Sequence, residues 1–549
     1  MLVTQTPIET LLDRAQSIPD APWLHQSTHD VWRAYSYREI ADEVMRMATV
    51  LKEMLPPGSA VGIGGRNTAH WFMADLAIAA AGMVSVGLYP MQSGEHTRYI
   101  LEHCEAKAVI VGPLMKPQEF MEAVPAGITT IRMPYPDAPP CQLEWSTLIR
   151  DAKPLAAPAV RAPDELVTLI YTSGTTGHPK GVMMNWTNIQ FTVSGLLQTM
   201  PPKPEEIFFS YLPLAHAFER GALELASLYL GAQVYFLEHL EKLPEQLSYV
   251  RPTRFFGVPL VYTRIQAGIL KKMPQEKLDK LLRIPLLSSL IKKKIKKAIG
   301  LDRAWLIFSG AAPMPKPLIE WFAKLGITIL QGYGMTENSI YASANLPWAN
   351  RIGSVGKEMV GANTKINPDG EILYKHPGVT PGYYKDPEKT RETFTEDGYL
   401  RTGDKGQLDA DGYLFITGRV KDIFKTMKGK YVAPAPIEGA LARNTDIDQL
   451  CFVGSELKQP IMLVSLNDMG RTKPRPDVER GLIEDMDAVN ATLEPHEAIG
   501  KIVVVRDVWT IENNLMTPTM KVKRNEIEKR YGAMIRKEGE TREKVSWES

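Results

Sequence analysis

Cysteine is scarce in this chain of 549 residues, and the few cysteines present are widely separated. Cys104, Cys141 and Cys451 show no Cys-x-x-Cys spacing. A disulfide framework and a structural zinc site both need paired or closely spaced cysteines. Both are therefore excluded, and a reducing compartment is expected.

Long apolar runs are lacking as well. The longest extends from Leu76 to Tyr89 and is interrupted by Gly82, so it falls short of the ~20 residues that a membrane-spanning helix needs. The N-terminus has no basic head followed by an apolar run, and the final Ser-Trp-Glu-Ser is neither a peroxisomal nor an endoplasmic-reticulum tail. We therefore expect a cytoplasmic protein.

Neither sign of charge predominates over the whole chain. Lys and Arg number 64 and Asp and Glu 63, for a net charge of +1, so no overall field favours nucleic acid and no nucleic-acid partner is expected. Residues 271–300 are the exception, with ten Lys or Arg against Glu276 and Asp279 and with apolar residues at helical spacing. This segment is typical either of a solvated helical pair with basic faces or of a peripheral contact with the inner face of an anionic membrane.

The length predicts two or more domains, because a single core stops growing well below 549 residues. Expected strands at 59–64, 83–88 and 108–111 alternate with expected helices at 69–81 and 95–105, which predicts parallel βαβ units. From residue 351 onward, short strands separated by Gly and Pro predict a small β region that includes a hairpin turn at Asp411-Gly412. The chain after residue 423 reads as a separate small α+β domain.

A glycine- and hydroxyl-rich stretch follows the expected buried strand 166–170. It runs Tyr171-Thr172-Ser173-Gly174-Thr175-Thr176-Gly177-His178-Pro179-Lys180-Gly181. Glycines allow the backbone to approach an anion closely, and hydroxyls, free N–H groups and Lys180 can then donate to phosphate oxygens. The common nucleotide loop requires Gly-Lys-Ser/Thr at its end. Here Pro179 precedes Lys180 and Gly181 follows it, so a kinase-type or GTPase-type loop is excluded.

This loop resembles the phosphate loop of the adenylate-forming, or AMP-binding, enzymes, and the chain is most similar to the long-chain fatty acyl-CoA synthetases from roughly residue 30 to 530. Further motifs occur in the family order: Leu212-Pro213-Leu214-Ala215-His216, Gly332-Tyr333-Gly334-Met335-Thr336-Glu337, Arg401-Thr402-Gly403-Asp404, Gly418-Arg419-Val420-Lys421-Asp422, and Leu515-Met516-Thr517-Pro518-Thr519-Met520-Lys521. The resemblance implies an α/β fold. Residues 1–418 would form a large domain of stacked, mostly parallel sheets flanked by helices plus a small β-barrel-like region, 419–422 a hinge, and 423–549 a small mobile α+β domain.

The resemblance also implies a two-step reaction. A fatty acid carboxylate attacks the α-phosphate of ATP to give an acyl-adenylate and pyrophosphate, and the thiol of coenzyme A then displaces AMP. Magnesium is the expected metal, and a homodimer is left open. The alternatives are a medium-chain or aryl acid–CoA ligase, an acyl-AMP ligase that loads a carrier protein, and a non-enzymatic fatty-acid or acyl-AMP binding protein. The absence of a carrier domain after residue 549 disfavours an assembly-line module.

Site residues follow from the same motifs. For the phosphates, the resemblance implies Thr172, Ser173, Gly174, Thr175, Thr176, Gly177 and Lys180. For the nucleoside it implies Gly310, Ala311, Gln331, Gly332 and Tyr333 around adenine, and Asp404 and Arg419 on ribose. Glu337 would hold Mg²⁺, with Thr336 on the α-phosphate, and His216 would lie near the substrate carboxylate. Phe256-Gly257-Val258-Pro259 would line the acyl pocket, Lys421 would be the pivot and Gly429 would approach the coenzyme A arm.

Lys521 is the expected catalytic residue, because a lysine placed between the carboxylate and the α-phosphate stabilises the charge of the adenylation transition state. Lys523 and Arg524 are close enough in sequence to compete for the assignment. Two positions depart from the family pattern. Trp186 replaces the usual residue in the Thr-His-x-Asn run, and Arg220 stands where some bacterial members have a gating tryptophan, so a tryptophan gate is not expected.

Overall fold

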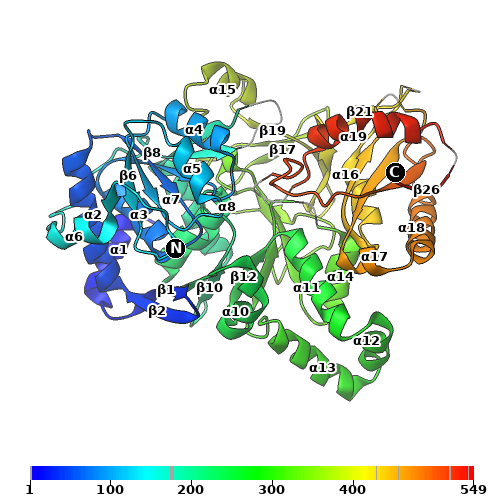
Figure 1. Ribbon diagram of the computed structural model, residues 1–549, viewed down its shortest axis with the longest axis horizontal. Coiled ribbons are helices and arrows are strands. Elements are labelled where there is room, and N and C mark those ends of the chain that lie inside the picture. Colours follow the sequence, from blue (N-terminus) through cyan, green and yellow to red (C-terminus); the bar gives the residue numbers. More distant parts are fainter. Residues whose placement is uncertain are drawn as a thin grey trace.

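The computed structural model describes residues 3–172, 178–312, 314–427, 429–455, 457–517, 521–541 and 543–548. The predicted loop residues Ser173, Gly174, Thr175, Thr176 and Gly177 lie outside these ranges. The first and last parts of the chain occupy opposite sides of the molecule, with the sheets of the large N-terminal part on the left of Figure 1 and the C-terminal part on the right.

The first sheet confirms the predicted parallel βαβ units. Its strand order is β7-β6-β5-β3-β4-β8-β9, and every pairing is parallel except that of β8 with β9. Helices α4 and α5 cover one face through a shared apolar core. The bounds are β3 Ala60–Gly64, β4 Val84–Leu88, β5 Ala108–Val111, β6 Thr129–Arg132, β7 Leu143–Glu144, β8 Leu166–Thr172, β9 Lys180–Asn185, α4 Gly94–His103, α5 Pro117–Ala123 and α6 Trp145–Asp151.

Helix α3 (Ala69–Ala80) packs between this sheet and a second one. Nearly all its residues are buried, as expected of a helix that is apolar on every face, and its side chains share a core with strands of both sheets. The second sheet has the order β16-β15-β14-β13-β12-β10-β11-β1-β2. Its bounds are β1 Pro22–Thr28, β2 Val31–Ser36, β10 Ile207–Ser210, β11 Gln233–Phe236, β12 Arg254–Gly257, β13 Leu306–Ser309, β14 Ile329–Tyr333, β15 Ser343–Ala344 and β16 Lys357–Glu358.

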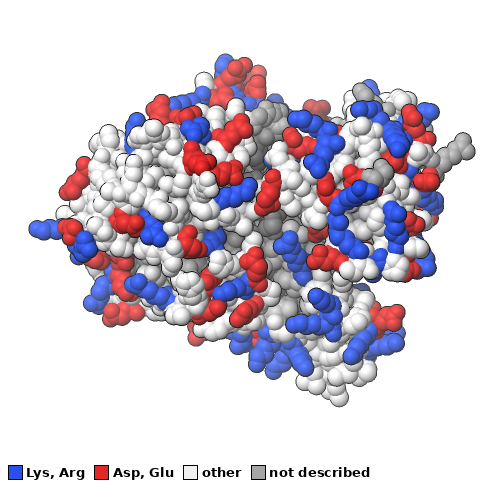
Figure 2. Space-filling model, in the orientation of Figure 1, with Lys and Arg blue, Asp and Glu red and all other residues white. Residues whose placement is uncertain are grey.

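Other helices complete the large part. They are α1 Pro7–Ser17, α2 Tyr37–Met54, α7 Trp186–Thr199, α8 Ala217–Glu219, η1 Arg220–Leu225, α9 Ala226–Leu230, η2 Leu240–Lys242, α10 Leu243–Val250, α11 Pro259–Lys272, α12 Gln275–Leu282, α13 Pro285–Ala298, α14 Lys316–Lys324, η3 Thr336–Asn338 and α15 Pro387–Thr393. Residues 271–300 thus form a helical pair, α12 and α13, as the sequence predicts. Figure 2 shows Lys and Arg gathered around it at the lower edge of the molecule.

The predicted small β region is an antiparallel sheet in the order β17-β18-β19-β20 (β17 Thr364–Ile366, β18 Glu371–Tyr374, β19 Leu400–Leu408, β20 Leu414–Arg419). The Asp411-Gly412 turn is confirmed: Gly412 has φ +80° and the Asp409 carboxylate accepts the backbone N–H groups of Asp411 and Tyr413. Strand β19 is longer than predicted, so Asp404 lies inside a strand.

The C-terminal part has its own sheet, β23-β24-β25-β26, and its own apolar cores. Helix α16 packs on β20 and α14 of the large part. The division at 418 with a hinge at 419–422 remains a prediction. The bounds are β21 Phe424–Lys425, β22 Tyr431–Val432, α16 Pro434–Leu441, β23 Ile447–Val453, β24 Ile461–Leu466, α17 Asp468–Thr472, α18 Arg475–Asn490, β25 Lys501–Val505, α19 Arg524–Glu538 and β26 Val545–Trp547. Across all described ranges, no helix combines the length and apolarity that crossing a bilayer requires.

Candidate active site

The phosphate loop joins two strands rather than a strand and a helix. Thr172 at the end of β8 pairs in antiparallel fashion with Lys180 at the start of β9. The sequence did not predict β9, and helix α7 follows it directly, beginning at Trp186. This pairing fixes Lys180 opposite Thr172. Lys180 lies in the region, here called the cleft, where Glu337 acts on the pKa of Lys180 and where Glu337 and Asp404 act on the pKa of Lys521.

Strands β13 and β14 deliver the nucleoside candidates. Gln331, Gly332 and Tyr333 lie within β14 and not in the loop after it. Gly310 follows β13, and a Cβ placed there would make ordinary van der Waals contacts, at 3.9 Å from the carbonyl oxygen of Gly332 and from the Phe218 ring. Ala311 adopts a left-handed φ of +66°. A non-glycine residue in that region stores strain, which the surrounding structure must hold in place.

Asp404 is the centre of a polar group that joins three strands. Its Oδ1 accepts a hydrogen bond from Arg419 Nε at 2.8 Å and its Oδ2 accepts one from Tyr333 Oη at 2.7 Å. The carboxylate is largely buried. An ionised carboxylate offers about four lone-pair sites, so Asp404 keeps capacity for two further O–H donors such as those of a ribose diol.

Glu337 lies in the short helix η3 directly after β14, and its carboxylate is buried. Tyr383 Oη donates to Glu337 Oε1 at 2.7 Å, and the Nζ of Lys180 lies 5.6 Å from the centroid of the Tyr383 ring. Tyr383 therefore links the metal candidate to the phosphate candidate. The sequence reasoning missed it, and its place after Pro381-Gly382 was the available signal.

The carboxylate fits a magnesium ion that is held mainly by phosphates. Within the described residues there is no group of three or more His, Cys, Asp or Glu that could cage a metal. Magnesium bound with nucleotides typically takes one or two carboxylates, phosphate oxygens and waters. A single carboxylate, that of Glu337, is sufficient for that role.

Lys521 reaches into the same cleft from the C-terminal part. The residue keeps exposed surface, while the neighbouring protein partly desolvates its ammonium group. Burial, together with the charge of Arg419, lowers the pKa of Lys521 to about 8, against the opposing attraction of Asp404 and Glu337. The two carboxylates and the lysine therefore share one site although they come from distant parts of the sequence.

The neighbouring cations point elsewhere. Lys523 donates to Asn514 Oδ1 at 2.6 Å, and Arg524 Nη2 pairs with Glu438 Oε1 at 2.6 Å within the C-terminal part. Their engagement leaves Lys521 as the cation of this loop that faces the cleft. The loop is closed by an antiparallel bridge between Met516 and Val522, with 518–520 outside the described ranges.

His216 lies beside the cleft as the N-cap of α8. Its Nδ1 accepts the backbone N–H of Phe218 at 3.2 Å. Burial and the charge of Lys521 lower the pKa of His216 to about 4, so the ring is neutral near pH 7. A neutral ring that accepts at Nδ1 carries its proton at Nε2, which makes Nε2–H the available donor.

Lys421 and Gly429 are less closely associated with the cleft. Lys421 is exposed, yet its charge contributes, after burial and Lys389, to lowering the pKa of Lys180. Gly429 has φ +76° and donates its N–H to Thr426 in the turn between β21 and β22. Their assigned roles as pivot and coenzyme A contact stay predictions.

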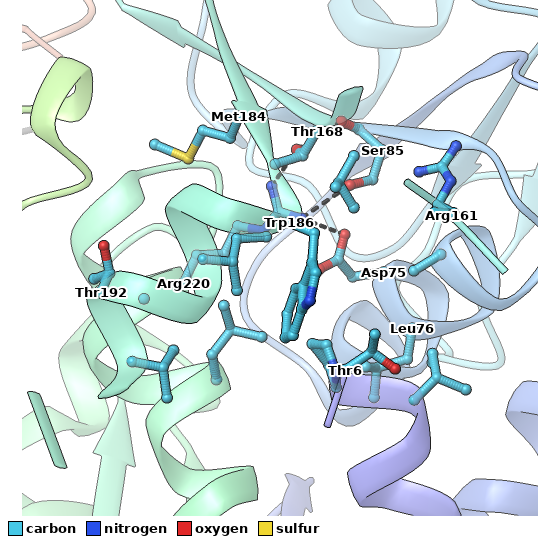
Figure 3. A pocket seen from close by; sticks show the side chains of 18 of the residues that line it. Thr6, Asp75, Leu76, Ser85, Arg161, Thr168, Met184, Trp186, Thr192 and Arg220 are labelled. Carbon is cyan, nitrogen blue, oxygen red and sulfur yellow. Dashed lines mark hydrogen bonds and ion pairs between the residues drawn. The ribbon is translucent and has the colours of Figure 1, made fainter. Parts of the chain in front are cut away.

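A mostly apolar cavity of about 320 Å³ lies between the first sheet and helices α3, α7 and η1 (Figure 3). It extends from Ala217, beside His216, toward Trp186 and Val160, and Figure 3 shows the Trp186 ring at its centre. The predicted acyl-pocket residues Phe256, Gly257, Val258 and Pro259 are not among the described residues that line it. Instead, Phe256 packs with Phe218 at 5.4 Å between ring centroids.

A buried ion pair forms part of the cavity wall. Arg220 Nη2 pairs with Asp75 and donates to Ser85 Oγ at 2.9 Å, and its Nη1 donates to Thr168 Oγ1 at 2.6 Å. Arg220 begins the π-helix η1. These partners indicate that Arg220 is a structural cation.

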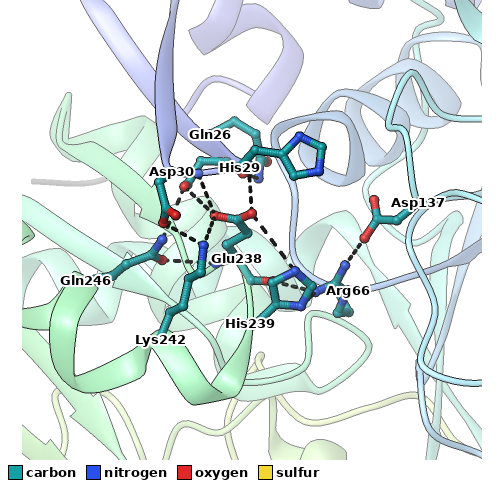
Figure 4. Close-up of polar contacts among 10 residues, drawn as sticks. Gln26, His29, Asp30, Arg66, Asp137, Glu238, His239, Lys242 and Gln246 are labelled. Atoms are coloured by element: carbon teal, nitrogen blue, oxygen red, sulfur yellow. Dashed lines mark hydrogen bonds and ion pairs between the residues drawn. The ribbon is translucent and has the colours of Figure 1, made fainter.

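A second polar network, shown in Figure 4, has a structural explanation. His29 and Asp30 form a two-residue turn with φ +49° and +64°, the geometry of a type I′ hairpin between β1 and β2. The Glu238 carboxylate accepts the backbone N–H of His29 at 2.8 Å and the ammonium of Lys242 at 3.3 Å. Burial opposes ionisation, but hydrogen bonds from Ser27, Asp30, His29 and Lys242 lower the pKa of Glu238 to about 2.

Sequence comparison identifies the family. A profile described as AMP-binding enzyme matches residues 11–384, and one described as AMP-binding enzyme C-terminal domain matches residues 421–540. This chain belongs to the AMP-binding enzyme family. The cleft that collects Lys180, Glu337, Asp404 and Lys521 is thus the candidate active site of an AMP-binding enzyme.

Curated AMP-binding relatives carry a consistent activity in their names. A long-chain-fatty-acid–CoA ligase of Xenopus laevis is 32% identical over 80% of this chain, which spans 66% of the length of that protein. A long-chain-fatty-acid–CoA ligase of Gallus gallus is 30% identical over 92% of this chain and 77% of its own length. Fatty acyl-CoA synthetase A of Dictyostelium discoideum is 30% identical over 91% of this chain and 85% of its own length.

Solved structures confirm the fold class. The anthranilate CoA ligase AuaEII in complex with anthranoyl-AMP aligns with a TM-score of 0.79 over 96% of this chain and 97% of that one, at 22% identity. The adenylation domain of a carboxylate reductase from Mycobacterium chelonae aligns with a TM-score of 0.81 over 97% and 91%, at 23% identity. The shared fold is the α/β arrangement with a smaller C-terminal part.

Proposed function

We propose that this AMP-binding enzyme ligates a long-chain fatty acid to coenzyme A through an acyl-adenylate, consuming ATP and releasing pyrophosphate and AMP. The observation that carries the proposal is the position of Lys521. It comes from the C-terminal part, and the charges of Asp404 and Glu337 in the cleft act on its pKa. A non-catalytic fatty-acid or acyl-AMP binding protein has no need of a partly desolvated cation there.

In the first step an oxygen of the fatty acid carboxylate attacks the α-phosphorus of ATP, and the bond to the pyrophosphate oxygen breaks. Negative charge increases between the two reactants, and Lys521 supplies a fixed positive charge at that point. His216 donates its Nε2–H to the other carboxylate oxygen, which orients the attacking one. Thr336 donates to the α-phosphate, while Lys180 and the loop from Thr172 to Gly177 bind the β- and γ-phosphates.

The nucleoside is held by the group around Asp404. The carboxylate accepts the ribose hydroxyls while Arg419 and Tyr333 keep it in place. The Tyr333 ring offers a flat apolar face to adenine, and Gly310 places no side chain at the edge of the ring. Glu337 would hold Mg²⁺, which when bound neutralises charge on the phosphates.

The second step needs a different arrangement, because the thiol of coenzyme A must reach the acyl carbon from the side that Lys521 occupies. We propose that the C-terminal part rotates about Lys421, withdraws Lys521 and brings the turn at Gly429 toward the coenzyme A arm. The thiolate attacks the acyl carbon, the bond to AMP breaks, and the thioester forms.

The acyl chain would occupy the cavity between η1 and β8. The cavity begins next to His216, its lining is largely apolar, and its volume of about 320 Å³ falls within the range of small-molecule pockets, roughly 300–1,000 Å³. Contact of residues 271–300 with a membrane and formation of a homodimer are further parts of the proposal.

The test is a panel of carboxylic acids with ATP and coenzyme A, monitored separately for pyrophosphate and for AMP. Long-chain acids should give both products. If medium-chain or aryl acids are preferred, the proposed substrate class is wrong. If pyrophosphate forms but no thioester appears until a carrier protein is added, the protein is a loading ligase. If acids bind and no pyrophosphate forms, the proposal of catalysis is refuted.

A further inference from the structure

Three large apolar side chains are exposed where α12 meets α13. Ile284 is 51% exposed, Leu290 66% and Leu286 86%. Figure 1 shows α12 and α13 extending from the lower edge of the molecule, away from the sheets. Exposed apolar residues that gather on one protruding tip mark an interaction surface more than residues scattered singly do.

The same segment concentrates the positive charge of the protein. Residues 271–300 hold ten Lys or Arg and two acidic residues, a formal charge of +8, so the rest of a chain with total charge +1 carries −7. Among the described residues, none of these ten cations forms an ion pair with a carboxylate. Ion pairs within the described residues therefore do not neutralise this charge, although Lys297 is close enough to Asp302 to contribute to the lowered pKa of that carboxyl.

One face of helix α13 carries the exposed apolar residues and then the basic residues, one after the other along the helix. Leu286 and Leu290 are four residues apart, and Lys293 and Lys297 continue the same face at seven and eleven residues from Leu286. All four are exposed, while Ile295 on the other face is buried in the core of the large part. The exposed face is apolar at the tip and basic toward its C-terminal end, and Figure 2 shows white surface between groups of Lys and Arg there.

The helical pair is held firmly to the body. Leu278 and Ile295 belong to the core beneath the second sheet. Trp321 Nε1 donates to Gln275 Oε1 at 2.8 Å, and Lys296 Nζ donates to the carbonyl of Gly326 at 3.2 Å. Because the pair is anchored on both helices, its tip is presented in a fixed orientation.

We propose that the tip formed by Ile284, Leu286 and Leu290 inserts into the surface of an anionic phospholipid bilayer, with the surrounding lysines on the lipid headgroups. A polyanion such as nucleic acid would neutralise the lysines but would leave the apolar side chains in water. A bilayer accommodates both the lysines and the apolar side chains, since amphipathic helices at membrane surfaces bury apolar residues beneath a basic rim. Under the proposed ligase function, this docking brings the enzyme to the phase in which long-chain fatty acids dissolve.

Flotation with lipid vesicles tests the proposal on the full-length protein. Binding should require vesicles that contain an anionic lipid, be weak on neutral phosphatidylcholine and fall with added salt, since charges are screened beyond about 8 Å at physiological ionic strength. The variant Leu286→Asp/Leu290→Asp should lose roughly tenfold or more in vesicle affinity for each leucine. Val31→Asp, at a position 70% exposed elsewhere, is the matched control and should bind like wild type.

A second pair separates charge from insertion. Lys293→Glu/Lys297→Glu should weaken binding to anionic vesicles by about fivefold or more per lysine, whereas Lys52→Glu/Lys537→Glu, at exposed positions away from the tip, should not. Melting temperature and pyrophosphate exchange with a water-soluble short acid, which should stay unchanged, show that each variant is folded.

Several results would overturn the inference. They are equal binding of the leucine variant and wild type, equal binding to neutral and anionic vesicles, and retention on heparin or DNA without vesicle binding. Vesicle binding is measured without substrates. Failure of the ligase proposal would appear in the product assay and leave the vesicle result unaffected.

Discussion

Replacing Lys521 tests the mechanism more directly than any other change. If its charge stabilises only the adenylation transition state, Lys521→Ala should slow adenylation by about 10²–10³, which corresponds to roughly 2.7–4 kcal/mol and matches the loss of one positioned donor at an oxyanion. The second half-reaction should survive. Given synthetic acyl-adenylate and coenzyme A, the variant should form thioester at nearly the wild-type rate.

The lowered pKa of Lys521 adds a pH dependence with a definite sign. Lysine is active when protonated, and a pKa of about 8 in the free enzyme means that kcat/KM for adenylation should fall as the pH rises through 8. The protonated fraction would drop from about 75% at pH 7.5 to about 10% at pH 9, roughly an eightfold loss. Lys521→Arg keeps the charge at all these pH values, so it should remove the alkaline decline while retaining part of the rate.

Pyrophosphate exchange measures the first half-reaction across this pH range, and thioester formation from acyl-adenylate measures the second. Lys523→Ala is the matched control from the same loop. Equal slowing of both half-reactions by Lys521→Ala, or an alkaline decline that persists in Lys521→Arg, would show that the lysine does not act as proposed. A first-step defect found only in Lys523→Ala would move the assignment by two residues.

Three further changes address the rest of the cleft. Asp404→Ala should raise the KM for ATP about tenfold or more, because hydrogen bonds to a charged acceptor contribute roughly 1.5–3 kcal/mol each; an unchanged KM would remove it from the ribose site. Tyr383→Phe removes the hydrogen bond that orients Glu337, so the Mg²⁺ concentration for half-maximal rate should rise about tenfold. A Mg²⁺ titration curve that stays in place would contradict this role of Tyr383. Arg220→Ala should lower the free energy of unfolding by about 3–5 kcal/mol, since Asp75 is left buried and unpaired; denaturant unfolding measures this, and a loss below 1 kcal/mol would mean that the pair is not structural.

Patterns in the sequence were sufficient to predict β3, β4, β5 and β8 of the first sheet, helices α3 and α4, the small β region and the family. Short, continuous apolar strands separated by helices are local patterns, and they placed β3, β4 and β5 within one residue of their observed bounds. The motifs named Lys180, Glu337, Asp404 and Lys521 because each carries a charge whose chemistry suits a nucleotide. Local patterning also predicted the helical pair at 271–300.

The contacts among these residues became visible only once the chain was folded. The sequence alone did not separate Lys521 from its neighbours Lys523 and Arg524 as the catalytic candidate. In the structure, Lys523 donates to Asn514 and Arg524 pairs with Glu438. Tyr383 was missed because its partner Glu337 is 46 residues away, and β9 was missed because a hairpin depends on pairing with β8. Residues 256–259 do not line the cavity beside η1, and the contact of Phe218 with Phe256 could not be read from the sequence. Long-range packing, not local propensity, settles such contacts.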